Sequence, residues 1–277
     1  MLKNLLSISR HSFFSLLLLS FISPAYAHSP LTSRGEEWYA AILSTLLLAA
    51  FWLLYILGSR RTKASLWQQV SFHSGMIICY IAVLGPLDEW AKTSATAHMV
   101  QHMVLMLVVT PLWVLASPLA QFHAFGNWLV RLWQPFLLMV RYPMLMAYLH
   151  GATIWFWHIP YFYMLALDNV WWHVVEHAFF VVTAGLFWWS VLKSSHVQAH
   201  WALLASLLTL MHTGFLGALL TFAQSPLYGD TRSLADQQLA GLIMWVVGAG
   251  PYLAAACWAA ARWYQQRLRR QPVTEHS

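Results

Sequence analysis

Seven long apolar stretches limit what this chain can fold into. A helix needs about twenty consecutive apolar residues to cross a bilayer, where every backbone polar group must be bonded within the segment. Of the 277 residues, 60% are hydrophobic and only 9% are charged, whereas about a quarter of the residues in a soluble domain are charged. The sequence therefore predicts an all-α integral membrane bundle of seven transmembrane helices. Their expected spans are 38–58, 67–87, 97–117, 142–162, 171–192, 201–224 and 237–261.

The first residues have the pattern of a secretory signal peptide. A positive segment with Lys3 and Arg10 precedes the apolar run SFFSLLLLSFIS, and a small-x-small cleavage site ends at Ala27. The run is short for a membrane span, which favours a cleaved signal over an uncleaved first helix. We predict a signal peptide over residues 1–27 and a single seven-helix membrane domain over residues 28–277.

Basic residues are distributed unequally between the two sides of the predicted bundle, and this bias sets its orientation. With the mature N-terminus outside, the inside loops hold ten basic residues: Arg60, Arg61, Lys63, Arg131, Arg141, Lys193, Arg262, Arg267, Arg269 and Arg270. The outside loops hold three: Arg34, Lys92 and Arg232. We therefore predict a multi-pass protein of the bacterial inner (plasma) membrane, with a periplasmic N-terminus and a cytoplasmic C-terminus. The net charge of +6 reflects this sorting across the lipid bilayer, so no nucleic-acid partner is expected.

Two histidine pairs are the most informative polar feature of the apolar segments. His98 and His102 lie in the third predicted span, and His173 and His177 lie in the fifth. Each pair has i, i+4 spacing, which places both imidazoles on one face of a helix. Ionisable side chains within a membrane span are costly and usually mark a functional site. Neutral imidazole is also the commonest metal ligand, so these pairs predict a metal site.

The predicted topology brings further polar groups to the membrane level of the histidine pairs. The third, fifth and seventh spans begin outside, and the fourth ends outside. Glu176 lies between the histidines of the second pair, His158 ends the fourth span, and Asp236 begins the seventh. We therefore expect the metal-site residues to converge near the outer surface: His98, His102, His173, His177, Glu176, His158 and Asp236.

Copper is the first candidate for the bound group, because imidazole and thioether ligands both suit it. Haem b is the alternative, since histidines on facing helices also serve as axial ligands of membrane haems. Glu176 is expected to orient an imidazole by accepting its free N–H. Secondary metal candidates, each with an ordinary packing or loop role as the competing interpretation, are Met99, Met103, Met106, His150, His212 and His28, the first mature residue.

Motifs for turnover chemistry are missing from the sequence. It contains no G-x-S-x-G, Walker A, H-E-x-x-H or G-x-G-x-x-G pattern. The segment HVVEH (173–177) displaces the glutamate relative to a zinc-protease helix, and Cys79 and Cys257 stand singly in apolar runs. We therefore expect a protein that is not an enzyme.

Three stretches resemble the multi-pass CtaG family of bacterial cytochrome c oxidase assembly factors. They cover residues 98–119, 156–189 and 225–250, and include the distinctive strings HMVQHM and ADQQLAGLIMW. The resemblance implies a role in respiratory chain biogenesis, namely helping copper reach the catalytic centre of a haem–copper oxidase. The family's recurrent polar positions fall on His98, Gln101, His102, His158, His173, Glu176, His177, Asp236, Gln237 and Gln238.

The expected function is therefore that of an oxidase assembly factor that binds copper at a periplasm-side histidine cluster. Its expected partners are subunits of the haem–copper oxidase and periplasmic copper chaperones. Two other classes remain open from the residues alone: a membrane electron-transfer protein that binds haem b, and a copper transport or resistance permease.

Overall fold

A computed structural model describes residues 34–195, 198–229 and 232–270 of the chain. All regular structure within these ranges is helical. The predicted signal peptide and His28 lie outside the described residues. The first half of the fold contains α2 (Glu36–Arg61), α3 (Leu66–Leu84), α4 (Pro86–Thr93), α5 (Ala95–Val104), the π-helix η1 (Leu105–Val109), α6 (Thr110–Ala116), α7 (Leu119–Phe125) and α8 (Asn127–Met139). The second half contains α9 (Pro143–Trp157), α10 (Pro160–Asp168), α11 (Val170–Leu192), α12 (Ala199–Thr221), α13 (Leu234–Leu242), the π-helix η3 (Ile243–Val247) and α14 (Gly248–Arg270).

Six helical segments in the described part are long and apolar enough to cross a membrane: Glu36–Arg61, Leu66–Thr93, Ala95–Ala116, Val170–Leu192, Ala199–Thr221 and Leu234–Arg269. The predicted span 142–162 is the exception, because α9 ends at Trp157 after 15 residues. Pro160 explains this break, since proline has no N–H for the preceding turn and pushes residue Ile159 out of the helical region. Ile159 indeed has extended backbone angles (φ −64°, ψ 127°). The count of seven spans stays a prediction.

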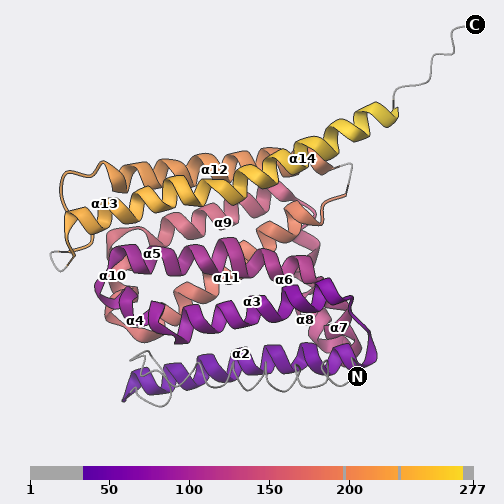
Figure 1. The fold of residues 1–277 in the computed structure, drawn as a ribbon, viewed down its shortest axis with the longest axis horizontal. Helices are drawn as coiled ribbons and strands as arrows, with labels where there is room; N and C mark the ends of the chain where they lie inside the picture. The colour runs from indigo at the N-terminus through magenta and orange to yellow at the C-terminus, as the bar shows by residue number, and fades with distance from the viewer. Residues whose placement is uncertain (1–33, 196–197, 230–231, 271–277) are drawn as a thin grey trace, which may run out of the picture.

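The helices form a layered bundle (Figure 1). α2 and α3 lie at one side, α12 and the long α13–α14 helix lie at the other, and α5, α9 and α11 lie between them. Close contact between α12 and α13 depends on two small residues. A Cβ atom added to Gly241 would lie 2.7 Å from the carbonyl oxygen of Gly217. Small residues at such crossings let membrane helices approach closely, which gains dispersion energy where no hydrophobic driving force exists.

The π-helix η1 follows the first histidine pair and results from a proline. In a π-helix each carbonyl accepts from the N–H five residues later, as the carbonyl of Leu105 does from the N–H of Thr110 at the end of η1. The carbonyl of Met106 would then need an N–H from Pro111, and proline has none. Its carbonyl instead accepts bonds from Trp188 Nε1 of α11 (2.7 Å) and Thr110 Oγ1 (2.8 Å). This arrangement ties the helix that contains His102 to α11, one turn beyond the histidine.

The two ends of the bundle differ in charge. At the acidic end, where α2, α5, α11 and α13 begin, Lys92 Nζ lies 3.6 Å from Glu37 Oε2, and Asp236 bonds to the start of α5. At the basic end, Arg61 bonds to the carbonyl of Ala124 and Arg262 to that of Ser194. In Figure 1 the acidic end is on the left and the basic end on the right.

Candidate metal centre

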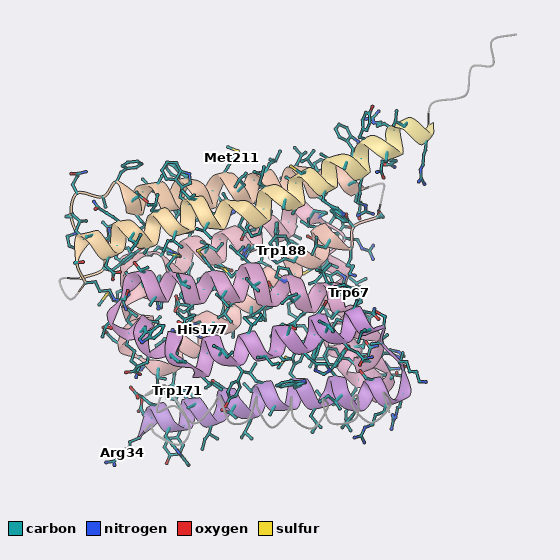
Figure 2. The ribbon with its side chains drawn as sticks, viewed as in Figure 1. Arg34, Trp67, Trp171, His177, Trp188 and Met211 are labelled. Carbon is teal, nitrogen blue, oxygen red and sulfur yellow. The ribbon has the colours of Figure 1, made fainter. Side chains whose placement is uncertain are left out.

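The two histidine pairs meet inside the bundle, one from α5 and one from α11. The ring centroids of His98 and His102 are 4.1 Å apart, and those of His173 and His177 are 4.2 Å apart. Across the helices, the His98 and His173 rings are 5.4 Å apart and the His102 and His177 rings 5.3 Å. We call these four residues and Glu176 the histidine cluster. Figure 2 shows His177 within the bundle, whereas Trp67 and Met211 lie at its periphery.

Matching positions on the two helices explain why the pairs meet. The first pair follows the first residue of α5, Ala95, by three and seven positions, and the second pair follows the first residue of α11, Val170, in the same way. Both helices begin at the acidic end, so the pairs reach the same depth, about 5–10 Å along each helix. α11 packs closely on η1 and α6, and the four rings fill the space between α11 and α5.

Three of the histidines could share one metal ion. His98, His102 and His173 each offer a ring nitrogen, and these nitrogens all lie within 4.8 Å of one another. A metal bonds to imidazole nitrogen at about 2.0–2.1 Å, so two ligands on one ion stand up to about 4.2 Å apart. A contraction of several tenths of an ångström would therefore complete a three-imidazole site.

Glu176 adds a buried carboxylate to the same space. Its Oε2 lies 3.5 Å from His102 Nε2 and 3.7 Å from His98 Nε2. Both separations exceed the usual 2.7–3.2 Å of a hydrogen bond. The side chain is only 1% exposed. The carboxylate therefore faces the imidazoles from a distance that leaves its oxygen available to a shared ion.

Unsatisfied polar atoms are concentrated at this site. Buried side-chain atoms without a hydrogen-bond partner include both ring nitrogens of His98, Nε2 of His102, Nε2 of His177 and Oε2 of Glu176. A buried donor or acceptor that lacks a partner costs about 1–3 kcal/mol. Native proteins satisfy most such groups, so the site offers several buried donor and acceptor atoms with which a bound ion could interact.

His158 approaches the cluster from the end of α9. Its Nδ1 lies 2.7 Å from the carbonyl oxygen of Ile154, which requires the proton on Nδ1. Its buried Nε2 has no hydrogen-bond partner and is then the free acceptor, the form in which imidazole binds metals. His158 also interacts electrostatically with His102 and Glu176. The break at Pro160 therefore places a fifth imidazole beside the histidine cluster.

Asp236 stabilises the site from outside the cluster. Its carboxylate accepts hydrogen bonds from the backbone N–H groups of Ala95 (2.6 Å) and Thr96 (3.1 Å) and from the Ser94 hydroxyl (3.0 Å). These donors belong to the first turn of α5, whose positive dipole end also favours a carboxylate. Asp236 thus fixes the start of the helix that presents His98, and the structure does not bring it among the imidazoles.

Two further polar contacts were not recognised in the sequence. Gln101 Nε2 donates to the Ala82 carbonyl and to Asp88 Oδ1, both at 2.8 Å, and thereby joins α5 to the end of α3 and to α4. Asp88 is itself buried. The position of Asp88 directly after the apolar run of α3 was a sequence signal that could have indicated this contact.

Arg232 is the second of these contacts. Although only 5% exposed, it donates to Tyr163 Oη and to the Ala91 carbonyl, both at 2.6 Å. The Tyr163 ring packs 5.2 Å from the His98 ring and stacks at 3.7 Å on Tyr228. Burial raises the pKa of the Tyr228 hydroxyl, with the neighbouring Tyr163 adding to the shift. The neutral Tyr228 hydroxyl donates to the backbone carbonyl of His158 at 3.2 Å.

The amides after Asp236 organise the loop before α13. Gln237 Oε1 accepts from the Leu227 N–H (2.7 Å), and Gln238 Nε2 donates to the Ala223 carbonyl (3.0 Å). These bonds shape the loop that contributes Tyr228.

The three methionine candidates belong to the apolar core. Met99, Met103 and Met106 are buried members of the main apolar core, and Met103 Cε lies 3.5 Å from a Cβ placed on Gly248 of α14. On α5 this methionine row is turned by about 100° from the histidine row.

His150 and His212 form a separate, deeper group. Both ring nitrogens of His150 are bonded, Nδ1 to Thr183 Oγ1 (3.2 Å) and Nε2 to Tyr252 Oη (3.1 Å). His212 packs on Gly151, where an added Cβ would lie 2.6 Å from His212 Nε2.

Comparison with known proteins identifies a family. The family model described as cytochrome c oxidase caa3 assembly factor (Caa3_CtaG) matches residues 49–266. This range contains the whole histidine cluster, His158 and Asp236. No curated protein and no solved structure matches the chain.

Proposed function

Since this chain belongs to the cytochrome c oxidase caa3 assembly factor family, we propose that it delivers copper to the catalytic centre of a haem–copper oxidase from the histidine cluster. In this proposal copper is the cargo. The protein holds the ion and passes it to an oxidase subunit, without catalytic turnover.

The observation that supports this proposal is the set of unpartnered buried nitrogens and the carboxylate oxygen facing one another between α5 and α11. Imidazole sites bind divalent copper more tightly than the other divalent first-row metals. The rings that face each other across the two helices, His98 with His173 and His102 with His177, have centroids only 5.4 and 5.3 Å apart, which is too close for a porphyrin plane to lie between them. The spacing therefore favours a single ion over haem b as the ligand of this cluster.

The depth of the cluster suits transfer at one membrane surface. We infer that the acidic end faces the periplasm, because the basic residues of the loops gather at the opposite end and basic loops stay in the cytoplasm. The N-terminus is then periplasmic, the C-terminus cytoplasmic, and the membrane is the bacterial inner membrane. A site about 5–10 Å below the surface exchanges copper with periplasmic chaperones and oxidase subunits, so the ion need not cross the bilayer.

The test is complementation of a strain that lacks this protein. We expect its oxidase to contain haem but little copper at the catalytic centre, as measured by the copper-to-haem ratio of the purified enzyme. The wild-type chain and the matched control His123→Ala, at an exposed histidine of α7, should restore the ratio. His102→Ala and His177→Ala should not, although both variants accumulate in the membrane.

Three outcomes would contradict the proposal. If the double variant His102→Ala, His177→Ala restored a fully metallated oxidase in the deletion strain, these histidines would have only a structural role. A Soret band in the purified assembly factor would support a haem-binding protein instead. Copper sensitivity of the deletion strain with a normal oxidase would support a permease.

A further inference from the structure

A pocket at the acidic end leads toward the histidine cluster. It has a volume of about 270 Å³ and lies between the start of α2, the end of α4 and the turn from α10 to α11. Three carboxylates, those of Glu36, Glu37 and Asp168, line it together with the ammonium group of Lys92. His173 of the histidine cluster also lines it. We call this pocket the vestibule.

A smaller cavity lies beyond the vestibule. It measures about 30 Å³ and is lined by residues of α2, α3, α4 and α11, including Ala41, Asp88, His173 and His177. The vestibule and this inner chamber share two lining residues, Val170 and His173. A water molecule needs roughly 10–15 Å³ of such volume, so the chamber accommodates an ion that has lost most of its hydration shell.

We propose that the vestibule and the inner chamber form the route by which a hydrated metal cation enters the histidine cluster, with His173 as the first imidazole that it meets. The route rests on the proposed function, because it leads to the copper site proposed above. It lies between α2 and α11, and none of the three methionines lines it.

Charge and chemistry along the route support this proposal. The vestibule lining is net negative, and Lys92 is held by Glu89 Oε2 at 2.9 Å and Glu37 Oε2 at 3.6 Å. A negatively lined cleft raises the local concentration of cations and their association rate. In the chamber, His177 is only 7% exposed and its Nε2 has no hydrogen-bond partner. The ion thus first meets carboxylate oxygens in the vestibule, which suit a hydrated ion. It then meets an imidazole in the chamber, which can replace one of its water ligands.

The first experiment changes the charge of the vestibule without touching the cluster. The full-length protein in detergent is mixed with copper(II) sulfate at low salt, and tryptophan fluorescence quenching is followed by stopped flow. The double substitution Glu36→Gln with Asp168→Asn should slow association about tenfold, and Lys92→Gln should accelerate it, because steering contributes about 10–10³-fold to such rates. Both effects should vanish near molar salt, where the screening length falls to about 3 Å.

The second experiment blocks the chamber. Ala41 is 4% exposed and lines it, so Ala41→Leu fills the space and should slow both binding and release of copper by a similar factor. The matched control is Ala50→Leu, at an exposed position of the same helix, which should leave both rates unchanged.

Equilibrium copper content separates the two proposals. If the wild-type chain binds copper but the charge variants and Ala41→Leu all show wild-type rates, the route is wrong and the copper site stands. If the wild-type chain binds no copper at equilibrium, the proposed function fails and the route fails with it. Rates that shift in opposite directions for the acid and lysine substitutions support the route.

Discussion

Two buried histidine sites of the same bundle differ in whether their ring nitrogens have hydrogen-bond partners. His150, on α9, is completely buried and both of its ring nitrogens are bonded, to Thr183 and to Tyr252. His98 and His102, on α5, are also buried, yet neither ring nitrogen of His98, nor Nε2 of His102, has a hydrogen-bond partner, and the Glu176 carboxylate lies 3.5–3.7 Å from the two Nε2 atoms. Both regions lie in a helical bundle and contain the same residue type.

The difference separates a structural histidine from a ligand-binding one. Thr183 Oγ1 already donates to the Phe179 carbonyl, so it accepts from His150 Nδ1, which leaves Nε2 to accept from Tyr252. His150, Thr183 and Tyr252 thus satisfy one another within the folded protein, whereas both ring nitrogens of the neighbouring His212 have no hydrogen-bond partner. In the histidine cluster, several buried nitrogens have no hydrogen-bond partner, and a buried polar network that is only partly satisfied is unfavourable. A bound cation would give these nitrogens a partner and so stabilise the site.

The largest expected effect is on copper affinity in His102→Leu. Losing a ligand should weaken binding by at least about 100-fold, the upper end of what outer-shell substitutions cost. The free energy of unfolding of the metal-free protein should stay equal or rise, because leucine fills similar volume and the lost Nε2 had no hydrogen-bond partner. Competition titration with a copper chelator and denaturant unfolding in micelles measure the two quantities. A large loss of stability with unchanged affinity would reverse the interpretation of this region.

A smaller effect is expected for Asp236→Ala, which acts on the cluster through α5. Removal of the carboxylate leaves the first-turn N–H groups of Ala95 and Thr96 without their acceptor and should destabilise the protein by about 0.5–2 kcal/mol. Copper affinity should fall about tenfold, as for other residues that orient ligands. Asp236→Asn retains a side-chain oxygen as acceptor, so it should recover part of the stability and part of the copper affinity. If Asp236→Ala lost as much affinity as His102→Leu, the aspartate would itself be a ligand.

The smallest expected effect on copper is in His150→Leu, the matched counterpart of His102→Leu. This substitution leaves the Tyr252 hydroxyl without its bond to the histidine and should destabilise the protein by about 1–3 kcal/mol. Copper affinity should change by less than about twofold, because substitutions at separate sites without shared partners act nearly independently. Parallel titrations of both leucine variants make the comparison. A copper defect in His150→Leu would extend the metal site into the deeper group.

Local sequence patterns predicted much of this site. The i, i+4 spacing of each histidine pair, together with the expected direction of each span, placed His98, His102, His173 and His177 at one level, and the structure brings them together there. The methionines followed the histidines in sequence, but helix geometry turns Met99 and Met103 into the apolar core.

Contacts between distant residues could not be predicted in the same way. Asp236 bonds to the start of α5 across about 140 positions, and Arg232 reaches Ala91 over a similar separation. Most of their partners are backbone groups, which leave no sequence signal. The end of α9 is different, since Pro160 indicated a break that hydropathy alone overlooked. Pro111 was likewise an unused signal of an irregular helix after His102, because it removes the N–H that Met106 would need.

The most direct test of the account is the electron paramagnetic resonance spectrum of copper(II) bound to the purified full-length protein, with the metal content measured on the same sample. We expect one copper per chain and hyperfine splitting from the nitrogens of His98, His102 and His173. In the His98→Ala, His102→Ala double variant this signal should disappear. A spectrum that the double variant leaves unchanged, or a wild-type protein that retains no copper, would contradict the central claim that the cluster is a copper site.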